Sequence, residues 1–132
     1  MKKNLIIIFS FLVLAMIFLN FTVEKPPNLS PEGTVKSFQK AYDEKDIQLF
    51  KQLFAESYLK ENFPNGDKDI NNLLTIGDLE FTNIHMIKKE DRKAIVGFIT
   101  TFNNGEHSNE NKWEVTIQLQ NSKWLIYEMN IN

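Results

Sequence analysis

Apolar residues recur at two different spacings along this chain, and the change from one spacing to the other separates a helical part from a strand part. Between residues 30 and 77 they recur every three or four positions, which is the spacing of amphipathic helices. From residue 78 onward, apolar and polar residues alternate in runs that short polar stretches separate, as in strands. Residues 5–19 follow neither pattern, because Ser10 is the only polar residue among them. The chain therefore consists of an apolar N-terminal segment, a helical part and a strand part.

The helical part predicts three helices. A serine N-cap, a proline and an acid at residues 30–32 begin the first helix, whose apolar stripe runs to Tyr42. Asp46 caps a second helix, which ends before Pro64 because proline disfavours helical geometry in the residue that precedes it. The predicted helices run from Pro31 to the charged residues 43–45, from Asp46 to Phe63, and from Asp67 or Asp69 to Gly77.

The strand part predicts four strands joined by short connections. The clearest is Trp113–Gln120, where apolar and polar residues alternate so that one face is buried and one is exposed. Short connections between consecutive strands imply an antiparallel meander. We therefore expect an α+β fold, in which three helices pack on one face of a curved four-stranded antiparallel sheet. The predicted strands are 79–88, 93–102, 113–120 and 124–131, with a charged turn at 88–93 and a polar loop at 103–111.

The apolar N-terminal segment is long enough to cross a membrane. Residues 5–23 would span about 28 Å as a helix, close to the thickness of the hydrocarbon core. No pair of small residues marks a cleavage site after it, so we favour an uncleaved anchor, with a cleaved signal peptide and a secreted domain as the alternative. Lys2 and Lys3 place the N-terminus in the cytoplasm and the domain outside. Residues 24–29, which include two prolines, are interpreted as a stiff spacer before a domain at 30–132.

Composition excludes several classes of function. The 132 residues fit one domain, and the 15 basic and 17 acidic residues exclude a nucleic-acid binder that relies on a large basic surface. The absence of cysteine excludes disulfides, thiolate catalysis, cysteine–zinc sites and a lipid anchor on cysteine. There is no glycine-rich dinucleotide or phosphate loop and no zinc-protease or serine-hydrolase signature, so no cofactor is expected.

The sequence at three places carries a resemblance to a known superfamily. SPEGTVKSFQKAYDEKD at residues 30–46, IQLFKQLF at 47–54 and KWLIYEMNI at 123–131 resemble the first two helices and the last strand of nuclear-transport-factor-like (NTF2-like) proteins. The resemblance covers residues 30–132 and implies the cone-shaped fold also called ketosteroid-isomerase-like or SnoaL-like. In the isomerase branch, a tyrosine and carboxylic acids transfer protons in an apolar cavity. Membrane-tethered members with a similar layout serve as scaffolds in envelope transfer machines.

The resemblance directs attention to a few side chains that could line a cavity. The candidates are Tyr42, Asn83, His85 and Glu128, with Tyr58 as a further tyrosine. Each has an ordinary alternative, since Tyr42 fits a helix core position, while His85 and Glu128 fit exposed strand positions. The loop residues Glu106, His107 and Glu110 could hold a divalent cation, but the short polar sequence favours a solvated hairpin loop, so no metal site is predicted. The charged turn at 88–93 could touch an acidic partner or lipid headgroups, or could simply be solvated.

Three functional hypotheses follow. The first is a membrane-tethered, extracytoplasmic, non-catalytic module that is held in the bilayer by residues 5–23 and binds a protein partner or a small apolar ligand. The second is an enzyme of the isomerase or dehydratase type, which needs two or more titratable groups that converge in one pocket. The third is an inhibitor or immunity protein directed at a secreted enzyme. A polar outer sheet face predicts a monomer or a weak homodimer; it comprises Glu114, Thr116, Gln118 and Gln120.

Overall fold

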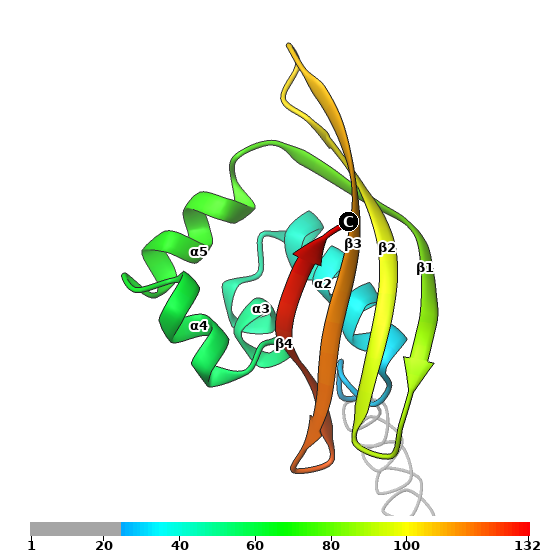
Figure 1. The fold of residues 1–132 in the computed structure, drawn as a ribbon. Helices are drawn as coiled ribbons and strands as arrows, with labels where there is room; N and C mark the ends of the chain where they lie inside the picture. Colours follow the sequence, from blue (N-terminus) through cyan, green and yellow to red (C-terminus); the bar gives the residue numbers. More distant parts are fainter. Residues whose placement is uncertain (1–24) are drawn as a thin grey trace, which may run out of the picture.

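The computed structural model describes residues 25–132, and the predicted anchor at 1–23 lies outside the described residues. Four helices come first, and they pack over one face of a four-stranded sheet (Figure 1). This arrangement confirms the predicted α+β class. Within residues 25–132, no helix is both long and apolar enough to span a bilayer. The elements are α2 (Pro31–Glu44), α3 (Ile47–Leu53), α4 (Glu56–Asn62), α5 (Asp67–Leu74), β1 (Asp78–Lys89), β2 (Lys93–Asn103), β3 (Ser108–Gln120) and β4 (Lys123–Ile131).

The sheet is the predicted antiparallel meander, with strand order β1-β2-β3-β4. The alternation seen in the sequence of β3 is also confirmed, because Val115 and Ile117 are buried while Glu114 and Thr116 are only partly so. The polar loop predicted at 103–111 is shorter than expected. Strands β2 and β3 stay paired as far as Asn103 and Ser108, so only residues 104–107 remain in the turn.

The helical part contains four helices, not the three that the spacing predicts. The predicted second helix is broken after Leu53, where Phe54 and Ala55 have extended backbones. The amide of Ala55 donates to the carbonyl of Ile126 in β4 at 2.8 Å, and Phe54 forms an isolated bridge with the same residue. This pairing with a strand far along the chain interrupts the helix, and the chain restarts as α4.

The boundaries of the first helix agree with the prediction, because local capping fixes them. The Ser30 hydroxyl accepts a hydrogen bond from the amide of Gly33 at 3.0 Å, and Pro31 occupies the first turn. At the other end, Lys45 adopts a left-handed conformation with φ of 55°, and its amide bonds to the last carbonyls of the helix. The buried stripe of this helix includes Phe38 and Tyr42.

Strand β1 contains a bulge that reverses the facing of its side chains. Thr82 pairs with Ile99 and His85 with Gly97, so β1 has one extra residue in this interval. Asn83 lies within it with φ of 54°. Because side chains alternate strictly along a strand, this inserted residue exchanges the inner and outer faces of the residues that follow it, until a second register shift between Met86 and Lys88 restores them.

The described residues that precede α2 are attached to the domain. The side chain of Asn28 is buried, and its amide donates to the carbonyl of Gln52 at the end of α3 at 3.1 Å. Its own carbonyl accepts from the amide of Trp124 at 2.9 Å. One residue earlier, the Pro27 carbonyl accepts from the Ser37 hydroxyl at 2.7 Å. These bonds fix the predicted spacer against α2, α3 and the start of β4.

Replacing Asn28 tests this attachment. Asn28→Ala leaves the buried end of α3 without a donor, and we expect the free energy of unfolding to fall by about 1–3 kcal/mol. The measurement is urea unfolding of the full chain in mild detergent, followed by tryptophan fluorescence. Asn72→Ala, at an exposed position of α5, is the control and should change stability by less than about 0.5 kcal/mol. Equal effects of the two substitutions would contradict the attachment.

Candidate ligand-binding cavity

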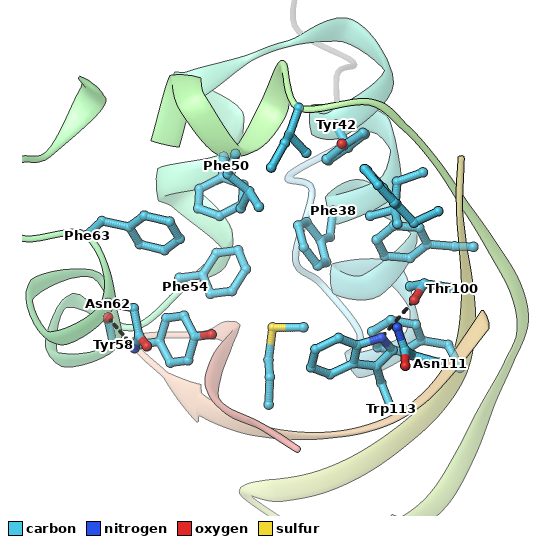
Figure 2. Close-up of a pocket in the computed structure, with 17 residues that line it drawn as sticks. Phe38, Tyr42, Phe50, Phe54, Tyr58, Asn62, Phe63, Thr100, Asn111 and Trp113 are labelled. Carbon is cyan, nitrogen blue, oxygen red and sulfur yellow. Dashed lines mark hydrogen bonds between the residues drawn. The ribbon is translucent and has the colours of Figure 1, made fainter. Parts of the chain in front are cut away.

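A cavity of about 440 Å³ lies between the helices and the inner face of the sheet (Figure 2). Its volume falls in the range of about 300–1,000 Å³ that small-molecule sites occupy. Its walls come from α2, α3, α4 and α5, from all four strands and from the segment that joins α5 to β1.

Most of the cavity wall is aromatic. The buried part of the wall contains Phe38, Tyr42, Phe50, Phe54, Phe81 and Phe98, and the more exposed part contains Tyr58, Phe63, Phe102 and Trp113. The remaining lining side chains are apolar or uncharged polar groups, namely Asn62, Leu73, Ile76, Leu79, Thr100, Asn111 and Met129. None of these lining residues carries a carboxylate, an imidazole or a cationic side chain, so the cavity favours an uncharged ligand.

The aromatic walls support one another. The Phe38 ring meets the rings of Phe54 and Phe81 edge-on, with centroids 5.3 and 4.9 Å apart. Phe81 in turn stacks on Phe98 with an angle of 5° between the rings. These are the favourable geometries of aromatic pairs, and each adds about 0.5–1.5 kcal/mol beyond the burial of its area. The rings are therefore held in place before any ligand arrives.

Three polar side chains of the wall are already bonded within the protein. The Tyr42 hydroxyl donates to the carbonyl of Gly77 at 2.8 Å. The indole N–H of Trp113 donates to the Thr100 hydroxyl, also at 2.8 Å, and is thereby directed away from the middle of the cavity (Figure 2). Tyr42 is buried, and its pKa is raised mainly by burial and further by the charge of Asp78. Tyr42, Thr100 and Trp113 thus act chiefly as parts of the wall.

Tyr58 is oriented differently. Its ring stacks on Phe54 with centroids 5.1 Å apart, and its hydroxyl points towards the middle of the cavity (Figure 2). Burial raises the pKa of this hydroxyl, and the negative charge of Glu61 raises it further. The phenol is therefore neutral at physiological pH and can donate or accept one hydrogen bond.

The cavity contains two of the predicted side chains and lacks three. Tyr42 and Tyr58 line it. Asn83, His85 and Glu128 are exposed and do not. Strict alternation along β1 would place His85 on the same face as Phe81, but the bulge at Asn83 turns it outward.

The surroundings of the outward-facing residues explain their positions. The His85 ring lies over Gly97, where an added Cβ atom would come within 2.7 Å of it, and its Nδ1 lies 2.7 Å from the carbonyl of Asn83. Glu128 pairs across the sheet with Thr116 on the outer face and accepts a bond from Asn130 at 3.1 Å. The side chains that would have to converge for proton transfer therefore diverge.

The spacing of apolar residues predicts which positions are buried, but it does not distinguish the core from a cavity wall. Phe50 and Phe54 belong to an apolar stripe, and such a stripe looks the same whether it faces another side chain or an empty space. The available signal is the high phenylalanine content of the domain, since residues 25–132 contain seven phenylalanines and all seven line the cavity. Within residues 25–132, no three potential metal ligands are gathered in one place.

Comparison with known proteins identifies the fold. No protein-family model matches the chain, and a comparison with curated proteins also finds no match. Among solved structures, a SEC-C motif-containing protein from Rhodopseudomonas palustris has a TM-score of 0.63 at 17% identity, covering 77% of this chain and 78% of that one. An NTF2-like protein of unknown function from Shewanella oneidensis has a TM-score of 0.54 at 14% identity, covering 74% and 92%. A candidate aromatic ring hydroxylase from Novosphingobium aromaticivorans has a TM-score of 0.52 at 13% sequence identity, and the match covers 83% of this chain and 96% of that one.

These neighbours confirm the resemblance to NTF2-like proteins found in the sequence. At such low identities, the likeness establishes the fold and leaves the function to be argued from the cavity.

The phenol of Tyr58 gives a test of the cavity's electrostatics. Removing the charge with Glu61→Gln should lower the pKa of Tyr58 only in part, because burial is the larger cause of its rise. In the unsubstituted chain, the unfolded state releases this proton first, near pH 10, so the contribution of Tyr58 to stability is lost as the pH rises further. The measurement is ultraviolet titration of phenolate, with Tyr58→Phe to assign the signal. Glu56→Gln, on the same helix, is the control, and an equal shift in both glutamine variants would contradict the assignment.

Proposed function

We propose that this domain is a binding module that holds a small, flat, uncharged apolar molecule in its aromatic cavity. The observation that carries the proposal is the wall itself, which combines ten aromatic rings with no charged side chain. A ring system is the ligand that such a wall accommodates best, because flat apolar faces can stack on it. Structural neighbours such as the NTF2-like protein of unknown function and the candidate ring hydroxylase are compatible with a cavity-based role.

The energetics favour binding of such a molecule. A ligand that buries about 200 Å² of apolar surface gains roughly 5 kcal/mol from removal of that surface from water. Little of this gain is spent on ordering the protein, since the rings around Phe38 are already packed against each other. The hydroxyl of Tyr58 supplies one hydrogen bond, which would orient a ligand that carries a single polar group.

The cavity gives less support to the isomerase or dehydratase alternative. That alternative needs convergent titratable groups, and the candidates His85 and Glu128 lie on the outer face of the sheet. The titratable groups of the wall are Tyr42 and Tyr58, and the hydroxyl of Tyr42 is bonded to Gly77. No observation favours the inhibitor or immunity alternative.

The proposal includes a membrane tether, with residues 5–23 as its anchor and the domain outside the cell. Its support is the sequence, in which an apolar run follows Lys2 and Lys3. The attachment of Asn28 to the domain agrees with this role, because it leaves only a few residues between the proposed anchor and the folded part.

Methyl resonances of methionine can detect the ligand. Met129 lines the cavity, whereas Met86 is half-buried and packs against the core outside it. With methionine methyl groups labelled in the detergent-solubilised full chain, we expect 2-naphthol, a neutral two-ring probe, to shift the Met129 signal saturably and to leave Met86 nearly unchanged. Parallel, non-saturating shifts of both signals would contradict a defined site.

Two substitutions by tryptophan show whether 2-naphthol binds in the cavity. Leu73→Trp fills the cavity from α5 and should weaken naphthol binding by about tenfold or more, which corresponds to 1.4 kcal/mol. Leu125→Trp adds the same ring at a half-buried position on the outer face of β4 and should leave the affinity unchanged. Equal losses would point to a general effect on folding instead of blocked space.

The tether is tested by membrane extraction. The full chain should stay with the membrane pellet in alkaline carbonate, because a predominantly apolar segment of the length of residues 5–23 is enough to hold a protein in the bilayer. A variant that carries Leu12→Lys and Ile17→Lys should move to the supernatant, since a charge at the centre of a span costs about 2.5–3.5 kcal/mol. Lys25→Leu, just outside the span, is the control. Release of the unsubstituted chain by carbonate would overturn the tether.

A further inference from the structure

The first residues that the structure describes, from Lys25 onward, lie at the end of the domain that also contains the β1–β2 and β3–β4 turns (Figure 1). The amide of Trp124, at the start of β4, donates to the carbonyl of Asn28 at 2.9 Å. The ammonium of Lys89, before the β1–β2 turn, lies 5.9 Å from the centroid of the Trp124 ring. The carbonyl of Arg92, within that turn, accepts from the amide of Leu119 at 2.9 Å. Residues 25–32, 88–93 and 120–123 thus form one end of the molecule, called the basic end below.

Charge is distributed unevenly between this end and the rest of the domain. The basic end carries six basic side chains against the three acidic ones of Glu32, Glu90 and Asp91. The rest of residues 25–132 carries seven basic and thirteen acidic side chains. The domain as a whole is therefore acidic, but one end is positive. The six basic residues are Lys25, Lys88, Lys89, Arg92, Lys93 and Lys123.

The side chains of the basic end are available to a partner. All six basic residues are exposed. The ion pair between Lys88 and Glu90 measures 3.1 Å, but both side chains are more than half exposed, so it contributes little. Leu29, at the same end, is also 55% exposed.

We infer that the basic end rests on the membrane surface and binds anionic lipid headgroups. The inference rests on the proposed tether, and it adds an orientation and a ligand to it. Asn28 is fixed to the domain, and the five residue-to-residue steps from Val23 to Asn28 can span at most about 18 Å. The proposed anchor thus ends close to the basic end and not to any other surface.

The electrostatic attraction between the basic end and an anionic membrane surface is sufficient to orient the domain. Each basic residue near an anionic membrane surface adds to the attraction, and the effect acts within a Debye length of about 8–10 Å. The basic end falls within this range when the short connection holds it at the surface. The acidic remainder of the domain is repelled by the same surface, so both terms favour one orientation. Leu29 can then lie among the headgroups, where exposed apolar side chains are stabilised.

Because the chain has no cysteine, a single label can be placed at either end of the domain. Asp91→Cys places a fluorophore at the basic end, and Glu106→Cys places one in the β2–β3 turn, with the same change of charge. The full chain is reconstituted into phosphatidylcholine vesicles with or without phosphatidylglycerol, and a quencher is attached to the lipid headgroups. We expect quenching at position 91 to increase with phosphatidylglycerol and position 106 to stay unquenched. Raising the salt to 1 M, where the Debye length is about 3 Å, should remove the increase.

Charge reversal identifies the residues responsible. Lys88→Glu, Lys89→Glu and Arg92→Glu together should abolish the lipid-dependent quenching at position 91. Reversal of three exposed lysines elsewhere changes the net charge equally and should have no such effect; these are Lys40, Lys60 and Lys68. Equal loss in both triple variants, or quenching of the unsubstituted chain that ignores phosphatidylglycerol and salt, would overturn the inference.

The failure of the tether can be distinguished from the failure of this inference. Flotation with pure phosphatidylcholine vesicles reports the anchor alone. A chain that does not float overturns the tether, and with it the orientation. A chain that floats but shows no lipid-dependent quenching overturns only the binding of anionic headgroups, and the basic end would then be assigned to an acidic protein partner.

Discussion

The packing of one ring, Phe38, joins the helical layer to the sheet. Its edge-on contacts reach Phe50 in α3, Phe54 at the break after α3 and Phe81 in β1, at centroid separations of 4.9–5.6 Å. These contacts hold the helices against the concave face of the sheet, and they also fix part of the cavity wall. The same interaction therefore stabilises the fold and shapes the cavity. A smaller side chain at position 38 would enlarge the cavity and weaken the interface between the two layers.

The sequence predicts most of the fold, because most of it is encoded locally. Ser30 and Pro31 begin α2 through capping, and the alternation from Trp113 to Leu119 fixes the inner face of β3. The predictions of the helices and strands are wrong where a contact with a residue far along the chain determines the local backbone structure. The break at Phe54 and Ala55 depends on pairing with Ile126, about seventy residues later, and no local pattern contains that information.

The candidate site is predictable only in part, for two physical reasons. A single inserted residue at Asn83 reverses the facing of His85, and periodicity cannot reveal where a strand will accept a bulge. The resemblance to NTF2-like proteins makes Tyr42 a cavity candidate, and the local apolar stripe of α2 correctly predicts that it is buried. Whether a buried ring such as Phe50 faces another ring or an open space depends on how far the helices lie from the sheet. The spacing of apolar residues does not encode that distance.

The proposed ligand site and the proposed orientation together describe one module, in which an uncharged ring compound is held close to a lipid surface. The most direct test is native mass spectrometry of the full chain purified from its own cell membranes in mild detergent. We expect an intact chain that retains residues 1–23 and carries the additional mass of one small organic molecule, which is absent from the Leu73→Trp variant. A chain that has lost residues 1–23, or one that co-purifies with a protein while its cavity stays empty, would contradict this description. In the second case the fold would serve as a docking scaffold.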